Sequence, residues 1–102
     1  MQPIITENIN AIKEICQKHQ VKEMAVFGSV TKDYFTDKSD IDVLIEFNDN
    51  IKHEEYADNY FSFADNLKNL LKKEIDLVTK QFIQNPYFLK AIQQNKQILY
   101  VA

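Results

Sequence analysis

Two aspartates separated by one residue, Asp40 and Asp42, are the strongest chemical feature of the sequence. They open an apolar run that ends at Phe47, and in a strand both carboxylates would lie on one face while Ile41 lies on the other. Like charges held this close repel, so the pair needs a compensating cation. Hard oxygen ligands suit magnesium, with manganese as the alternative. The pair therefore predicts a divalent-metal site at the end of a sheet.

The only glycine of the chain, Gly28, is followed by Ser29 and stands shortly before these aspartates. A chain that otherwise lacks glycine needs it here for a backbone angle, or for a close approach that a Cβ would block. Ser29 is predicted to open a helical turn whose amides point outward as an anion site. For Gly-Ser taken alone, an ordinary strand-to-helix turn capped by serine is an equal alternative.

The whole pattern is more specific than its parts. An apolar strand, Gly28-Ser29, a polar spacer, Ser39-Asp40-Ile41-Asp42 and a second apolar strand together resemble the motif of the nucleotidyltransferase superfamily related to DNA polymerase beta. The likeness is greatest to the minimal nucleotidyltransferases, small proteins of about this size, and it covers nearly the whole chain. It implies an α+β fold, with a small mixed β-sheet and helices packed on it, in a single domain over residues 1–102.

A third acidic residue, Asp76, lies in the strand-like run of residues 74–78. Minimal nucleotidyltransferases carry an acidic residue in a strand of similar sequence, which places Asp76 beside Asp40 and Asp42. The resemblance implies that Asp40 and Asp42 hold the metal that bridges a triphosphate. It also implies that Asp76 holds a second metal or takes the proton from an incoming hydroxyl. Read alone, Asp76 equally fits a solvated charge at the end of a strand.

Three further residues are predicted to contact the nucleotide. The resemblance implies that Gly28 and Ser29 cradle the β- and γ-phosphates. Lys32 stands where relatives commonly carry an arginine a few residues after Gly-Ser. Lysine neutralises a phosphate as a point charge but cannot form the bidentate fork of arginine. Contact with the nucleotide and simple solvation are both open for Lys32.

The resemblance also implies a reaction and a partner. ATP is the usual substrate of the family, with Mg²⁺ or Mn²⁺ as the cofactor. The chain has no second domain to present an acceptor, so another molecule must supply it. Minimal nucleotidyltransferases of this kind act as antitoxins that transfer AMP to a tyrosine hydroxyl of a HEPN-type ribonuclease toxin, which is the expected partner. The alternatives are a non-catalytic module that neutralises its partner by masking, and transfer to a small molecule.

Composition adds limits on location and partners. The formal net charge of −3 does not suggest a broad basic surface, so no direct binding of nucleic acid is expected. The single cysteine, Cys16, excludes an internal disulfide, suits a reducing compartment and falls on the apolar side of a predicted helix. No leader opens the chain, and no apolar run approaches the roughly 20 residues of a membrane-spanning helix. A soluble, cytoplasmic protein is expected.

Apolar periodicity predicts the remaining elements. Helices are expected over about residues 6–19 and 54–71, with a last short helix from near Pro86. Strands are expected over residues 21–27, 41–47, 74–78 and 98–101.

Two aromatic pairs carry separate expectations. Tyr34 and Phe35 are predicted to anchor the polar loop before the aspartates to the core. Tyr60 and Phe61 are adjacent and cannot both lie at the centre of one helix face. An exposed member of that pair would be a candidate for binding a partner.

Overall fold

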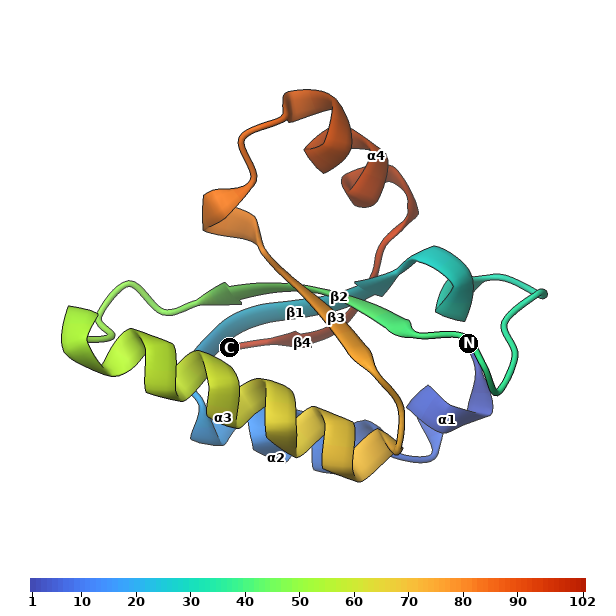
Figure 1. Cartoon of the computed structure of the whole chain (residues 1–102), viewed down its shortest axis with the longest axis horizontal. Helices are drawn as coiled ribbons and strands as arrows, with labels where there is room; N and C mark the ends of the chain where they lie inside the picture. The colour runs from blue at the N-terminus through green and yellow to red at the C-terminus, as the bar shows by residue number, and fades with distance from the viewer.

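A four-stranded mixed sheet forms the frame of the fold, and the computed structural model describes every residue from 1 to 102 (Figure 1). The strands are β1 (Val21–Phe27), β2 (Ile41–Phe47), β3 (Ile75–Thr79) and β4 (Gln97–Val101), in the order β3-β2-β1-β4. β1 runs antiparallel to both neighbours, whereas β2 and β3 are parallel. The parallel pair requires a crossover, which helix α3 (His53–Leu71) supplies. The predicted α+β class is confirmed.

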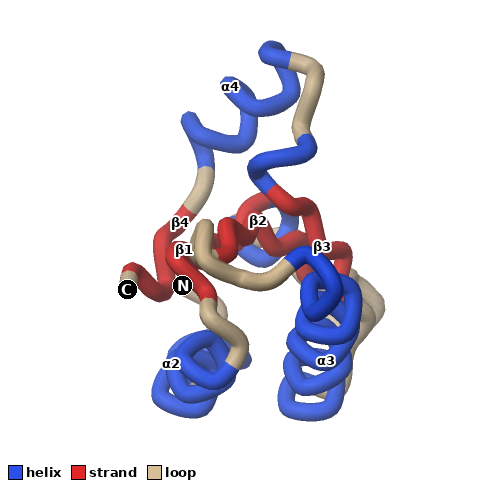
Figure 2. The backbone as a smooth tube through the Cα atoms, turned by 90° about the vertical axis from the view of Figure 1, so that its left-hand side faces the viewer, coloured by secondary structure: helices blue, strands red, loops and turns tan.

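The helices lie on both sides of this sheet (Figure 2). The short α1 (Pro3–Thr6) leads into α2 (Ile9–Lys18), and α2 and α3 lie side by side under one face. Helix α4 (Pro86–Asn95) stands on the opposite side. Two 3-10 turns, η1 (Gly28–Thr31) and η2 (Lys80–Phe82), follow β1 and β3. None of the helices combines the length and the apolar character that crossing a membrane requires.

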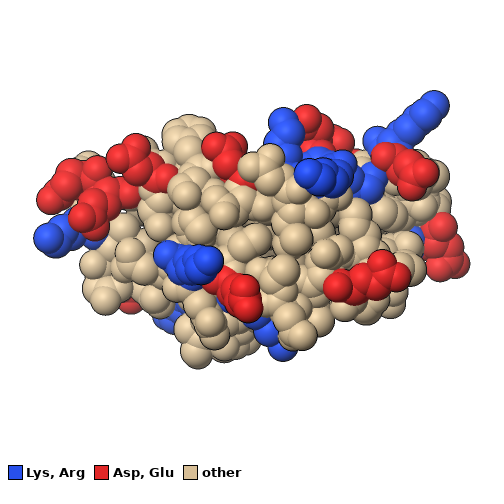
Figure 3. Space-filling model, turned by 90° about the horizontal axis from the view of Figure 1, so that it is seen from below, with Lys and Arg blue, Asp and Glu red and all other residues tan.

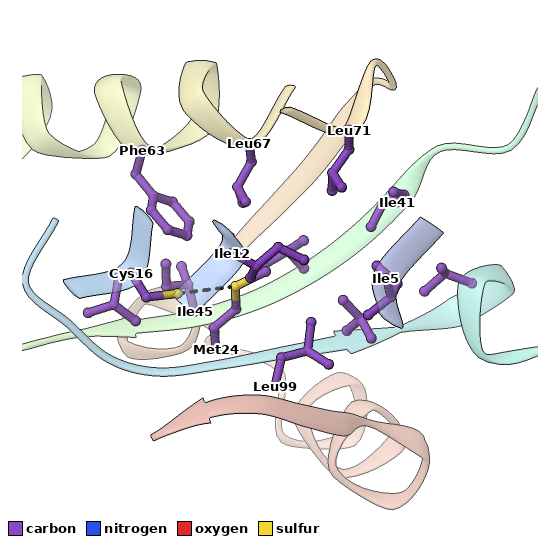
Figure 4. Close-up of a cluster of buried hydrophobic side chains, with 14 of the residues drawn as sticks. Ile5, Ile12, Cys16, Met24, Ile41, Ile45, Phe63, Leu67, Leu71 and Leu99 are labelled. Atoms are coloured by element: carbon purple, nitrogen blue, oxygen red, sulfur yellow. Dashed lines mark hydrogen bonds between the residues drawn. The ribbon is translucent and has the colours of Figure 1, made fainter. Parts of the chain in front are cut away.

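The apolar core fills the space between the sheet and helices α2 and α3 (Figure 4). Successive residues of a strand point to opposite faces, so alternate residues of β2 enter this core. They are the buried Ile41, Val43, Ile45 and Phe47. Helix α3 meets them with Phe63, Leu67 and Leu71. Asp42 therefore lies on the other face of β2, toward the side of α4.

Cys16 behaves as a small apolar residue of this core. It is fully buried on α2, and its Sγ lies 3.5 Å from Sδ of Met24 (Figure 4). Burial raises the pKa of the Cys16 thiol to about 12, so the thiol stays protonated and unreactive at neutral pH. The predicted packing role is confirmed.

The predicted helix over residues 6–19 was too long at its start. The chain turns at Glu7 and Asn8, so that α1 ends at Thr6 and α2 begins at Ile9. The side-chain amide of Asn8 donates to the backbone carbonyl of Ile4 at 2.8 Å. Asparagine often competes with helix in this way, because its side chain bonds to nearby backbone groups.

The expected anchoring of the loop was half wrong. Phe35 packs against the core, but Tyr34 leaves 70% of its surface exposed. A single aromatic ring fills the available site, and the ammonium of Lys73 lies 4.9 Å from the centroid of the Phe35 ring. In the second pair Phe61 is the exposed member, at 63%, while Tyr60 packs against the core.

Candidate active site

The parallel pairing of β2 and β3 places Asp42 directly beside Asp76. Each is the second residue of its strand, so both carboxylates stand at the same end of the sheet. The pKa of Asp42 rises to about 6 because the side chain is partly buried and because the charge of Asp76, a hydrogen bond with Asp76 and the charge of Asp40 all favour the protonated form. The two strands thus hold an acidic pair that resists full ionisation.

Asp40 completes the acidic group from a less enclosed position. It lies one residue before β2, and its side chain is exposed. The next amide, of Ile41, donates to the carbonyl of Glu74 at 3.0 Å, which joins the start of β2 to the start of β3. The structure therefore brings all three predicted acids, Asp40, Asp42 and Asp76, to one end of the sheet.

Gly28 makes room for Asp42. Its φ is +70°, in the left-handed region that L side chains rarely adopt. β1 and β2 also pair Phe27 with Asp42, and a Cβ added at Gly28 would overlap Oδ2 of Asp42. Both reasons that predicted a glycine here, a special backbone angle and a close approach, are confirmed.

Ser29 and Lys32 follow in the 3-10 turn η1 and just beyond it. Ser29 is half-buried, and its carbonyl accepts the Lys32 amide at 2.9 Å. A turn is present as predicted, but it begins at Gly28 rather than at Ser29, and no side chain caps it. The side chain of Lys32 is exposed and borders a cavity of about 250 Å³, together with Gly28 and residues of α4 such as Phe88 and Ile92. This cavity opens beside the acidic end of the sheet.

The donor set suits a magnesium ion that is shared with a substrate. No group of three or more His, Cys, Asp or Glu side chains is arranged so that it could hold a metal ion by itself. Magnesium in proteins is usually bound by one or two carboxylates together with substrate phosphates, rather than by a complete protein cage. Asp42 and Asp76 in contact supply such a pair, and a cation between them would relieve the charge repulsion that, after burial, raises the pKa of Asp42.

One residue near the acids had no place in the sequence predictions. The ammonium of Lys73, at the end of the α3–β3 connection, donates to carbonyls of the loop that precedes Asp40. Its only signal in the sequence is its position shortly before the strand that carries Asp76, where it reads as a solvated charge.

This fold carries carboxylates paired across parallel strands beside a glycine turn, which is the arrangement that the sequence predicted for a nucleotidyltransferase. The model of the nucleotidyltransferase domain family matches residues 9–99, and the chain belongs to this family. The likeness to minimal nucleotidyltransferases that the motif indicated is confirmed, as is the prediction of an enzyme of this class.

Relatives cover almost the full chain. A protein of Methanocaldococcus jannaschii named "Putative protein adenylyltransferase" is 38% identical over 93% of this chain and 99% of its own length. A second protein of that organism with the same description is 34% identical over the same shares.

Solved structures share the fold at lower identity. A chain in a toxin–antitoxin crystal structure with AMP-PNP superposes with a TM-score of 0.72 at 18% identity, covering 93% of this chain and 74% of that one. The structure of a minimal nucleotidyltransferase superposes with a TM-score of 0.69 at 20% identity, covering 91% of this chain and 90% of that one. A chain from the complex of a tri-AMPylated Shewanella oneidensis HEPN toxin with MNT antitoxin superposes with a TM-score of 0.66 at 17% identity. The match covers 95% of this chain and 72% of that one.

The acidic pair makes the stability of the metal-free protein depend on pH. The pKa of Asp42 in the folded state, about 6, lies above its ordinary value of 3.8, so folding favours the protonated form. This contribution is complete below about pH 4 and is lost as the pH rises through about 6. We expect the urea midpoint in EDTA to fall between about pH 4 and pH 7.

Replacing Asp42 by asparagine should remove that fall, whereas Asp49→Asn, at an exposed acid in a turn, should leave it unchanged. An Asp42→Asn midpoint that falls as steeply as that of the wild type would contradict the origin assigned here.

The contact between Gly28 and Asp42 can be measured with a double-mutant cycle. Gly28→Ala should lower the free energy of unfolding by more than the roughly 1–2 kcal/mol of a left-handed alanine, because its Cβ also displaces Asp42. In an Asp42→Ala background only the backbone cost remains, so the same change should cost less. Equal costs in the two backgrounds, measured by urea unfolding, would show that the two sites do not interact.

Proposed function

We propose that this protein transfers AMP from ATP to a tyrosine hydroxyl of a HEPN-type ribonuclease toxin and thereby acts as its antitoxin. The observation that carries the proposal is the pairing of Asp42 with Asp76 beside the Gly28 turn. Two sets of proteins support it: relatives described as protein adenylyltransferases, and structural neighbours from toxin–antitoxin complexes, one with AMP-PNP and one with a tri-AMPylated toxin. ATP and the toxin would both be met in the cytoplasm.

The residues of the site would have separate roles in nucleotidyl transfer. Asp40, Asp42 and Asp76 would hold Mg²⁺, or Mn²⁺ in its place, and the amides that follow Gly28 would receive the β- and γ-phosphates. When bound, the metal neutralises charge on the phosphates as the reaction proceeds. Lys32, exposed beside Gly28, can add a point charge to the same phosphates.

The reaction itself exchanges one phosphoester bond. The acceptor oxygen attacks the α-phosphorus in line, a new P–O bond forms, the bond from the α-phosphorus to the bridging oxygen breaks, and pyrophosphate leaves. The proton of the acceptor hydroxyl must go to a nearby base. Asp76 is exposed on the edge strand β3, where an acceptor can reach it, and it either takes this proton or holds a second ion.

An apolar groove next to Asp76 is a suitable place for the toxin to dock. Leu77, Val78 and Thr79 continue directly from Asp76 and line this groove of about 640 Å³ together with α3, η2 and α4. Phe61 and Phe82 stand at its border with 63% and 68% of their surfaces exposed. A partner held here would bring its acceptor side chain to the end of the same strand.

Charge favours a basic partner at this groove. Glu54, Asp58 and Asp65 are exposed and lie at helical spacing on the same stripe of α3 as Phe61. Figure 3 shows acidic side chains gathered at the end of the molecule where α3 begins. A ribonuclease binds the phosphates of RNA with basic side chains, so an acidic stripe beside an apolar groove complements it.

The catalytic proposal is tested by incubating the protein with labelled ATP, magnesium and the product of the neighbouring gene. Asp42→Asn should lower label transfer by at least about a hundredfold, because it removes a charge that holds the ion. Asp49→Asn serves as the matched control for loss of one acid. Absence of transfer by the wild type would refute the reaction.

The same variants separate catalysis from masking. If the protein only covers its partner, the double variant Asp40→Asn/Asp42→Asn should still neutralise the toxin in growing cells. If transfer is required, this variant should bind the toxin and fail to protect.

The docking proposal is tested with an aromatic pair. Phe61→Ser should weaken binding to the toxin by about tenfold or more, as expected when an exposed aromatic side chain that the partner covers is truncated. Tyr87→Ser removes a ring that is even more exposed, at 82%, and that does not line the groove, so it should change little. Calorimetry gives the affinities, and label transfer should show a higher KM for the toxin with kcat unchanged. Equal effects of the two substitutions would place the toxin elsewhere.

A further inference from the structure

The ammonium of Lys73 is held by the backbone of the loop that precedes the aspartates. Its Nζ donates to the carbonyls of Thr36, Asp37 and Ser39 at 3.2, 2.7 and 2.9 Å. Lysine has three donors and no acceptor, so this arrangement uses all of them. The ring of Phe35, 4.9 Å from Nζ to its centroid, faces the same charge. A built-in cation thus occupies a site made of main-chain oxygens and one aromatic face.

The loop that Lys73 binds is closed on itself. The Thr36 amide donates to Oγ of Ser39 at 3.1 Å, and the Ser39 amide donates to the Thr36 carbonyl at 3.0 Å. Asp40 is the next residue. On its other side the Ile41 amide donates to the Glu74 carbonyl at 3.0 Å. Asp40 therefore lies between two links to the chain segment that leads into β3, the strand of Asp76.

Other lysines near this loop differ from Lys73. Lys38, Lys68 and Lys72 are exposed and border the same polar cavity of about 460 Å³. Lys68 forms an ion pair with Glu74 at 3.0 Å, with both side chains largely in solvent. Such pairs contribute little to stability. Several lysines set the charge around the loop, whereas Lys73, half-buried, also fixes its position.

We propose that Lys73 is a positioning residue that fastens the loop of residues 36–39 to the start of β3 and so holds Asp40 in place beside Asp42 and Asp76. Without it, three converging carbonyls lose their donor and the loop is free to move away from the strand that carries Asp76. The effect of this positioning on catalysis rests on the proposed function. The positioning itself does not depend on which acceptor is used.

The direct test compares Lys73→Met with Lys38→Met, which removes one positive charge from the same cavity but leaves the backbone hydrogen bond of Lys38 in place. Amide hydrogen exchange of Ser39 and Ile41 should be about tenfold faster or more in Lys73→Met, because both amides bond within the loop or across to Glu74. Lys38→Met should exchange as the wild type does. Circular dichroism checks that each variant is folded.

Metal binding by the free protein gives a second readout. Lys73→Met should weaken the affinity for Mn²⁺ by about tenfold or more, as is typical when a group that orients a metal ligand is removed. Asp40→Asn should weaken it similarly, and the double variant should be no weaker than Asp40→Asn alone, since Lys73 acts through Asp40. Lys73→Arg, which can still donate to the carbonyls, should recover part of the affinity.

These outcomes separate the two proposals. Amide hydrogen exchange and Mn²⁺ binding require neither ATP nor a toxin, so both measurements test the positioning role even if no AMP transfer is found. Unchanged exchange and Mn²⁺ affinity in Lys73→Met would overturn the positioning role. An equal effect of Lys38→Met would also overturn it, because it would reduce the role of Lys73 to its charge.

Discussion

The constraint on which this site depends is the parallel pairing of β2 and β3, which places two carboxylates side by side. Strands β2 and β3 bring Asp42 into register with Asp76, and the partial burial of Asp42, together with the charges of Asp76 and Asp40, raises its pKa to about 6. A cation placed at this end of the sheet would favour the ionised form of both carboxylates.

The two faces of the sheet contribute in different ways to the placement of these carboxylates. One face of the sheet is covered by α2 and α3, whose apolar side chains pack against β2 (Figures 2 and 4). The other face keeps its polar end open, where Gly28 leaves space for Asp42. β3 is at the edge of the sheet, so a macromolecule can approach Asp76 without any rearrangement of the core.

Local sequence patterns predicted correctly those elements whose structure depends mainly on neighbouring residues. The bounds of β1 and β2 match the predicted runs of residues 21–27 and 41–47, because each is an apolar segment bounded by polar turn residues. Gly28 was recognised because it stands alone in the chain. The errors came from competition that the apolar pattern does not show: the Asn8 side chain interrupts the first helix, and only one ring of Tyr34 and Phe35 fits against the core.

By itself, the sequence determined the kind of chemistry, because the spacing of Asp40 and Asp42 and the lone glycine are short-range features that also identify the family. Only the tertiary structure decided that Asp42 and Asp76 share one register and that Lys73 holds the loop before Asp40. These residues lie more than 30 positions apart and meet through the crossover helix α3. Strand register and backbone contacts of this kind depend on how the whole sheet assembles, and no local pattern encodes them.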